Sequence, residues 1–353
     1  MIPIPQHLAI PWRMELYMRM VDLFSGAGGL SLGLEQAGFE SVMAVEVVKD
    51  ACETYSKFFP KASLKDANIE TLDFRPLRGK VDLVAGGPPC QPFSSGGKRL
   101  ASEDERDMLP QYLRAISEIA PPVFLMENVF GLATGERAAY LESFLTEFRN
   151  LGYDVTWRVL NAAEYGVPQK RRRLFVVGSR VGTFAFPTPT HGPAAGTPFR
   201  HAGSVLLKAG VIGTPNTSKV FYAKNPDLRP SFYDGHLFNG GGRPINLDDL
   251  CPTILASAGG NKTHFIDTLD EVPEYHAALL RGEPPRTGFV PGARRITVAE
   301  SALIQTFPAT AQFAGSSSSQ YRQVGNAVPP LLAEQLGKSI ARLLLDDAQA
   351  SAD

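Results

Sequence analysis

The sequence contains few cysteines and no long hydrophobic segment, and both absences limit what the chain can be. Its 353 residues include only Cys52, Cys90 and Cys251, too few for a disulfide framework or a zinc cluster. No apolar run reaches the roughly 18 residues of a membrane span. Residues 1–20 lack the charged region and apolar core of a signal peptide. We therefore expect a cytoplasmic protein that works without a metal.

The chain also lacks the excess of positive charge that many nucleic-acid-binding proteins carry. Its formal net charge is −1. Between Arg180 and Glu300 there are 12 Lys and Arg against 10 Asp and Glu, and the basic run Lys170–Arg173 lies just upstream. A nucleic-acid surface would therefore have to be a local patch on a nearly neutral protein.

The first half of the chain alternates apolar runs with helical patterns. The predicted strands are Met20–Phe24, Val42–Glu46, Val81–Ala85, Val123–Glu127 and Leu174–Val177. Between the first two, Leu30, Leu34 and Ala37 share one helix face, and Gly38 is a natural stop. Strands alternating with helices predict an α/β fold with a doubly wound parallel sheet, in which ligands bind at the carboxyl ends of the strands.

The composition changes near Arg180. Residues 181–300 are rich in Gly, Pro, Thr and Asn, with short strand-like runs at Thr253–Leu255 and Thr263–Ile266 and no long helical period. Helical patterning returns at Val298–Thr306 and Pro329–Leu345. We expect a large domain of residues 1–185 plus 313–353 and a smaller, loop- and strand-rich domain of residues 186–312.

Two glycine-rich segments follow predicted strands. Asp22–Gly29 connects a strand to a helix, where glycines let a ligand approach backbone N–H groups, and Glu46 ends the next strand. A tight turn and a surface carboxylate explain these residues equally well. In Gly86–Ser94, prolines bracket Cys90, which indicates a rigid loop with an accessible thiol rather than the usual buried cysteine.

Charged residues follow the next two apolar runs of the chain. Glu127-Asn128-Val129 ends a strand, so the carboxyl of Glu127 is either a proton donor with a raised pKa or a cap of the next turn. Gln169–Arg173 precedes another strand, and alternate residues of an extended segment put Arg171 and Arg173 on one side. A solvated face, a phosphate contact and an active-site charge all remain open for that run.

The order of these segments, with Gln323–Pro330 near the C-terminus, resembles the bacterial DNA (cytosine-5)-methyltransferase family. The resemblance covers about residues 20–180 and 294–345, and PPCQPFS, ENV and Q-x-R-x-R in this order are highly specific. It implies a Rossmann-like enzyme that methylates carbon 5 of a flipped-out cytosine in a specific duplex DNA sequence. S-adenosylmethionine would be the cofactor. A restriction-modification context, with a separate endonuclease as partner, and a monomeric state are further expectations.

The resemblance also implies site residues. The cofactor positions are Phe24, Gly26, Gly28, Glu46, Val47, Asp66, Pro89, Leu109 and Asn326. Among them, Glu46 would bind the ribose, Val47 would pack on the adenine, and Asp66 would contact its amino group. Cys90 would be the nucleophile, Glu127 would stabilise the ring at nitrogen 3, and Arg173 would lie beside the base with Arg171 in support.

The middle of the chain lies where this family keeps its target-recognition domain. The candidate DNA-binding residues are Lys170, Arg243, Thr253, Asn261, Lys262 and His264. Gly259–His264 reads as a glycine-hinged polar loop suited to base edges, although an ordinary surface hairpin would have the same composition.

The same residues bear on three rival functions, the first of which they exclude. Methyltransferases acting on exocyclic amines need a polar residue before two prolines and an aromatic after them, whereas here Gly87 and Cys90 occupy those places. A tRNA cytosine-5 methyltransferase is the closest alternative, but its characteristic Cys-Phe-Thr stretch is missing. A non-catalytic relative would lack the nucleophile or the glutamate, and this chain keeps both.

Overall fold

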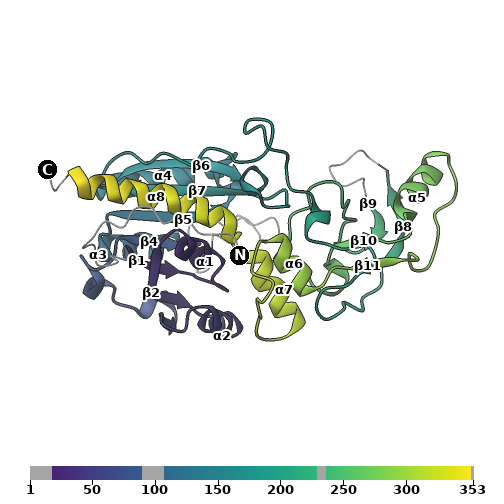
Figure 1. Cartoon of the computed structure of the whole chain (residues 1–353), viewed down its shortest axis with the longest axis horizontal. Helices are drawn as coiled ribbons and strands as arrows, with labels where there is room; N and C mark the ends of the chain where they lie inside the picture. Colours follow the sequence, from purple (N-terminus) through teal and green to yellow (C-terminus); the bar gives the residue numbers. More distant parts are fainter. Residues whose placement is uncertain (1–17, 90–106, 229–235, 351–353) are drawn as a thin grey trace, which may run out of the picture.

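The computed structural model describes residues 18–89, 107–228 and 236–350. These residues form two lobes (Figure 1). A large sheet with helices on its faces makes up one lobe, the small strands β8–β11 with α5 make up the other, and α6 and α7 lie between them. Among the residues in these ranges, no helix is long and apolar enough to cross a membrane.

The large lobe is an α/β structure. Its regular elements are β1 (Met18–Leu23), α1 (Gly29–Gln36), β2 (Phe39–Glu46), α2 (Lys49–Phe58), β3 (Ser63–Asp66), β4 (Leu83–Gly86), α3 (Leu109–Ile119), β5 (Val123–Val129), α4 (Arg137–Asn150), β6 (Asp154–Asn161), β7 (Arg172–Ser179) and α8 (Pro330–Ala350). The strand order is β3-β2-β1-β4-β5-β7-β6, and only β7 runs antiparallel to its neighbours. The predicted doubly wound fold is confirmed. Its strand order reverses direction between β1 and β4, where such sheets bind ligands.

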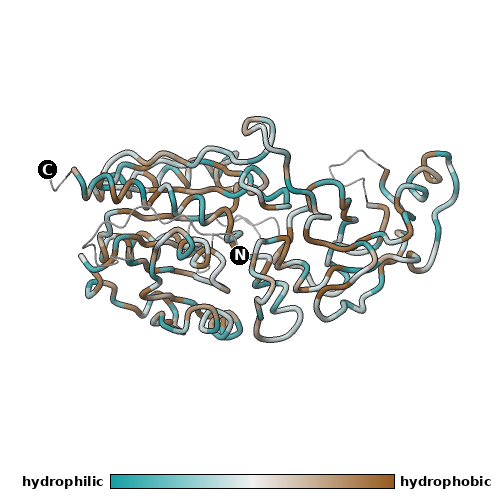
Figure 2. Tube along the Cα trace, in the orientation of Figure 1, coloured by the Kyte–Doolittle hydropathy of each residue, from teal (hydrophilic) through white to brown (hydrophobic). Residues whose placement is uncertain are grey.

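Alternation along the strands buries both faces of this sheet. Val21 and Val84 point to the face covered by α3 and α4, whereas Met20, Leu83 and Leu125 point to the face covered by α1 and α8. The central strands are accordingly hydrophobic along most of their length, while α8 alternates between polar and apolar residues (Figure 2). A strand buried on both faces reads as a continuous apolar run, which is why these strands could be predicted.

The five predicted strands correspond to β1, β2, β4, β5 and β7, and the predicted helix between the first two is α1, with Gly38 just beyond it at φ 99°. The edge strands β3 and β6 were not predicted because their exposed residues interrupt the apolar pattern. The prediction of a strand at Thr253–Leu255 is wrong. That segment is irregular, and its backbone groups bond to side chains.

The smaller lobe is built from short elements. They are β8 (Phe221–Asp227), β9 (His236–Asn239), β10 (Phe265–Asp267), α5 (Glu271–Leu280) and β11 (Ala293–Arg295). The sequence shows no long helical period here, yet α5 spans ten residues and buries Tyr275 and Leu279 in a separate apolar cluster. Between the lobes, α6 (Val298–Ile304) and α7 (Ser317–Asn326) belong to a third cluster, which joins Ala27 to Ile254 and Ile266.

Candidate active site

The glycine-rich turn after β1 and the end of β2 are tied together by one carboxylate. Glu46 accepts hydrogen bonds from the backbone N–H groups of Gly26 at 2.8 Å, Val47 at 2.8 Å and Val48 at 2.9 Å. The turn itself is left-handed at Phe24, Gly26 and, with a φ of 85°, Gly28. The candidate cofactor residues Phe24, Gly26, Gly28, Glu46 and Val47 therefore lie together, at the carboxyl end of the sheet.

Two buried polar side chains, one at the end of β1 and one in the turn, have atoms without hydrogen-bond partners among the described residues. Asp22 accepts a hydrogen bond from the Ser31 hydroxyl at 2.5 Å through Oδ2, but its buried Oδ1 has no partner among the described residues. The buried hydroxyl of Ser25 also has none. Burial raises the pKa of Asp22 to about 7, against the opposing effect of the Ser31 hydrogen bond. Because buried polar groups are normally satisfied, these atoms indicate a polar ligand beside the turn.

The remaining candidate cofactor residues lie around the same edge. Asp66 ends β3 and is directly opposite Glu46 in the strand register. The side chain of Val47 is 61% exposed, so an apolar surface is available next to Glu46. Pro89 and Asn326 are exposed, whereas Leu109 is fully buried at the start of α3 and can contribute only a wall.

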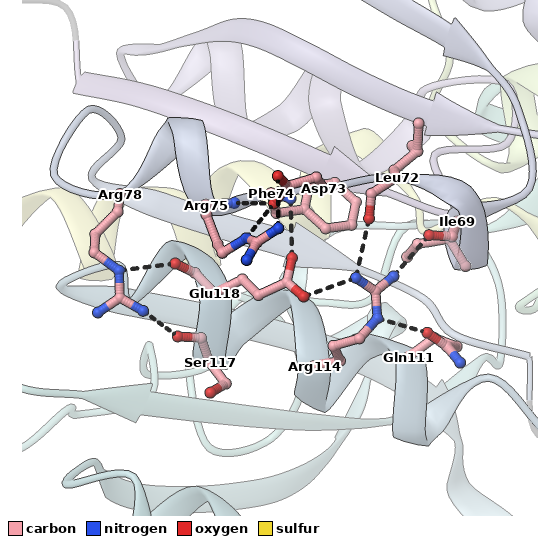
Figure 3. A network of polar contacts seen from close by, with 10 residues as sticks. All are labelled: Ile69, Leu72, Asp73, Phe74, Arg75, Arg78, Gln111, Arg114, Ser117 and Glu118. Atoms are coloured by element: carbon pink, nitrogen blue, oxygen red, sulfur yellow. Dashed lines mark hydrogen bonds and ion pairs between the residues drawn. The ribbon is translucent and has the colours of Figure 1, made fainter.

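A polar network fixes the wall between Asp66 and α3 (Figure 3). Arg114 donates to the carbonyls of Ile69 at 2.7 Å and Leu72 at 3.0 Å, and pairs with Glu118 at 2.9 Å. Glu118 in turn accepts from the backbone N–H of Phe74 at 2.9 Å. The segment that follows β3 is thereby held against the helix that begins at Leu109.

Glu127 and Arg173 form a largely buried ion pair near the end of β5. Arg173 Nε lies 3.1 Å from Glu127 Oε1, and the two side chains are 17% and 12% exposed. Burial raises the pKa of Glu127, although Arg173 and Arg171 oppose the shift. Burial lowers the pKa of Arg173, against the effect of Glu127. A carboxyl that is buried yet paired can hold or share a proton at this position.

The loop that carries Cys90 approaches this pair. A Cβ at Gly87 would lie 3.2 Å from Glu127 Oε2, so glycine permits the close passage of the loop. Asn128 donates from its side chain to the carbonyl of Pro88 at 3.0 Å, and the N–H of Met108 donates to the carbonyl of Pro89 at 3.0 Å. Cys90 itself lies outside the described residues and directly follows Pro89.

Arg171 occupies a different environment from Arg173. It is 1% exposed and donates to the backbone carbonyls of Ile254 at 3.0 Å, Gly325 at 2.8 Å and Ala327 at 2.9 Å. Burial lowers its pKa well below the usual value. The structure therefore brings Arg173, but not Arg171, into direct contact with Glu127, and Arg171 joins separate segments of the chain.

The candidate DNA-binding residues divide into exposed and buried groups. Asn261 and Lys262 are exposed in a short 3-10 turn, Gly260–Lys262. Lys170 pairs with Asp249 at 3.0 Å, and the Thr253 hydroxyl donates to the Lys170 carbonyl.

His264 is buried and fully bonded. Its Nδ1 accepts from the Arg243 backbone N–H at 2.9 Å, and its Nε2 lies 3.1 Å from the Thr253 carbonyl. The expected surface role is therefore absent in this structure, because both ring nitrogens face inward.

Comparison with known proteins identifies the family of this chain. The family model described as C-5 cytosine-specific DNA methylase matches residues 18–198 and 260–342, well over half of the sequence. The chain belongs to this family. The expectation of an S-adenosylmethionine-dependent DNA methyltransferase is thereby confirmed.

Individual relatives agree with this assignment. Type II methyltransferase M.PspPI of Psychrobacter is 37% identical over 92% of this chain and 79% of its own length. Type II methyltransferase M1.HphI of Haemophilus parahaemolyticus is 34% identical over 92% of this chain and 86% of its own length. Among solved structures, a Spodoptera frugiperda DNMT2 variant shares the fold with a TM-score of 0.70 at 21% identity, covering 92% of this chain and 99% of its own.

Several residues that build this site were missed from the sequence. Asn128 was quoted only as part of a motif, although it holds the Pro88 carbonyl. Gln169 and Gln305 are fully buried and bonded to each other at 2.8 Å. A polar residue directly after the apolar pattern of α6 was the available signal for Gln305.

The environment of His264 predicts a pH dependence of stability. Burial lowers its pKa from 6.5 to about 4, so the unfolded chain binds this proton more readily than the folded one. The stability it contributes is complete above about pH 6.5 and is lost as pH falls towards 4. We expect His264→Asn to reduce the free energy of unfolding at pH 7.5 by at most about 3 kcal/mol, and less at pH 4.5.

Denaturant titrations at the two pH values measure this difference. The exposed His201 is the matched control, and His201→Asn should leave both values unchanged. An equal loss of stability at both pH values in His264→Asn would contradict the assignment of a buried neutral imidazole.

Proposed function

We propose that this enzyme transfers the methyl group of S-adenosylmethionine to carbon 5 of a flipped-out cytosine in a specific duplex DNA sequence, with Cys90 as the nucleophile. The observation that carries the proposal is the Glu127–Arg173 pair, which lies beside the Pro88–Pro89 loop that leads to Cys90. A target base needs a nucleophile and a group that stabilises ring charge, and this arrangement offers both.

The cofactor fits the turn after β1. Glu46 is oriented by three backbone N–H groups and can accept from ribose hydroxyls, while the exposed Val47 offers an apolar surface for adenine. The unpartnered atoms of Asp22 and Ser25 would meet polar groups of the methionine part. When bound there, S-adenosylmethionine supplies an electrophilic methyl group.

The protein residues prepare the base. The thiolate of Cys90 adds to carbon 6, and the ring electrons become available at carbon 5 while Glu127 shares a proton with nitrogen 3. Arg173 stabilises negative charge beside the base. After methylation, a water molecule takes the carbon-5 proton, and the electron pair of that C–H bond re-forms the double bond between carbons 5 and 6. The Cys90–carbon 6 bond breaks in the same step, and its electron pair returns to the thiolate. Carbon 6 cannot be reached within a stacked duplex, so the base must be extruded.

We further propose that residues 186–312 form a target-recognition domain and that residues 1–185 and 313–353 form the catalytic domain. In support, the family model leaves residues 199–259 unmatched, as expected for a segment that varies with the recognised sequence. Asn261 and Lys262 are exposed candidates for base edges, Arg243 and Thr253 are half-buried candidates, and Lys170 is a candidate for phosphate contact. The type II relatives suggest a restriction-modification context with a separate endonuclease.

Cys90→Ala should abolish methyl transfer to duplex DNA while leaving S-adenosylmethionine binding near normal, because it removes only the nucleophile. Radiolabelled cofactor with duplex DNA or tRNA as acceptor measures transfer and tests the tRNA alternative directly. Cys251→Ala is the matched control, since that thiol is fully buried elsewhere. Duplex DNA with 5-fluorocytosine at the target should trap a covalent adduct in the wild type. Substantial turnover by Cys90→Ala would refute the assignment.

Glu127→Gln should lower the rate of methyl transfer by about 100-fold or more, because an amide cannot supply the proton at nitrogen 3. Single-turnover kinetics separate this step from product release. Glu142→Gln serves as the control, since it also removes a carboxylate paired with an arginine, at 2.6 Å from Arg149 on α4, outside the candidate site. A loss below about threefold would make Glu127 a structural residue.

Replacing residues 186–312 by the corresponding segment of a relative of known specificity should transfer that specificity, because base-edge contacts rather than phosphate contacts carry sequence information. Bisulfite sequencing of DNA from cells expressing the hybrid identifies the methylated sites. An active hybrid that still methylates the original sites would move specificity to the catalytic domain.

A further inference from the structure

Three polar side chains are buried where the two lobes meet. Gln169 and Gln305 have no exposed surface, and Arg171 is 1% exposed. We call these residues the junction cluster. Buried polar groups must find partners within the protein, so their hydrogen bonds report which segments are held together.

Gln305 lies at the centre of this cluster. Its Nε2 donates to the carbonyls of Val324 at 2.7 Å and Ala327 at 3.3 Å, and its Oε1 accepts from Gln169 Nε2 at 2.8 Å. Gln169 Oε1 in turn accepts from the backbone N–H of Ile254 at 2.8 Å. Arg171 joins the same two segments directly, because it donates to the carbonyl of Ile254 and to the carbonyls of Gly325 and Ala327.

One side of the cluster reaches the glycine-rich turn. A Cβ at Gly29, the first residue of α1, would lie 2.5 Å from the carbonyl of Val328 and 3.0 Å from the Cβ of Ala327. The chain at Ala327–Val328 therefore rests directly on the start of α1. A displacement of this segment would therefore move the backbone at Gly29, which directly follows Gly28 of the glycine-rich turn.

The other side reaches the candidate recognition residues. The Thr253 carbonyl meets Nε2 of His264, whose Nδ1 holds the backbone of Arg243. Contacts of packed and hydrogen-bonded groups thus run without interruption from Gly29 to Arg243. Such a path couples binding at its two ends only if a ligand at either end favours the same arrangement of the lobes. The coupling is then measurable, because a ligand at one end changes the affinity for a ligand at the other.

We propose that Gln305 is a positioning residue that couples the cofactor turn to the target-recognition loops. The proposal rests on the proposed function of the two regions that it joins. Gln305 fixes the Ile254 segment relative to Ala327, so that cofactor bound at the turn and DNA bound at the loops each favour the same alignment of the lobes. Gln169 transmits the contact to Ile254, and Arg171 reinforces it.

The test compares the affinity for S-adenosylhomocysteine, used as a cofactor probe, with and without a duplex carrying the methylated site found by bisulfite sequencing. In the wild type we expect the duplex to strengthen binding by about fivefold or more. In Gln305→Leu this ratio should fall to near 1, while affinity for the probe alone changes by less than about threefold. Isothermal titration calorimetry on the full chain measures both values.

Gln323→Leu is the matched control. This buried glutamine also makes three hydrogen bonds, to Thr54, Ala314 and Ser319, but has none to the junction cluster. Gln323→Leu should retain the wild-type ratio of affinities even if it lowers the stability of the protein by as much as Gln305→Leu does. If Gln305→Leu does not fold, Gln169→Leu removes the same connection from the other side and should give the same loss of coupling.

The proposal is overturned if the wild-type ratio is already near 1, if the Gln305 and Gln169 variants keep the wild-type ratio, or if Gln323→Leu loses it equally. Failure of the proposed function has a different signature, since the wild type would then transfer no methyl group to any duplex. A wild type that methylates DNA while its Gln305 variant keeps the full ratio would reject the positioning role alone.

Discussion

The burial of Arg171 is the constraint on which the arrangement of the two lobes depends. A guanidinium removed from water loses a large hydration energy, which only well-placed acceptors can offset. Here the acceptors are backbone carbonyls of Ile254, Gly325 and Ala327, which lie far apart in the sequence. Two of the three guanidinium nitrogens of Arg171 find acceptors only when the Ile254 segment and the end of α7 both reach the start of β7, while its buried Nε has no partner among the described residues. One side chain therefore makes the assembly of the two lobes cooperative.

The two arginines of Q-x-R-x-R thus separate into structural and chemical roles. Arg173 pairs with Glu127 at 3.1 Å, whereas Arg171 donates to the backbone carbonyls of Ile254, Gly325 and Ala327. Both nevertheless contribute positive charge near the loop after Gly87, since each lowers the pKa of Glu127 against the effect of burial. A positive field of this kind favours a thiolate over a thiol, which is what the proposed role of Cys90 requires.

The sequence predicted those parts of the fold and site in which local pattern and burial agree. Strands buried on both faces, such as β4 and β5, have continuous apolar runs and could be predicted. Glu127 could be recognised as a candidate site residue because its carboxylate directly follows such a run. The exposed edge strand β3 has no such run. His264 was misread because it follows a polar glycine loop, and nothing local reveals that the chain turns inward into β10 there. Long-range bonds such as Gln169–Gln305, 136 residues apart, leave no local pattern at all.

The junction also explains how a recognition segment can vary without losing its position. The family model matches the chain at Gln169, Arg171 and Gln305 but not between residues 199 and 259, where Thr253 and Ile254 lie. The bonds between this unmatched stretch and the junction cluster use the backbone N–H and carbonyl of Ile254. Backbone groups are present whatever side chain a position carries, so substitutions there can alter base contacts while the anchoring bonds persist. Specificity can then change in one lobe while the Glu127–Arg173 pair in the other keeps its geometry.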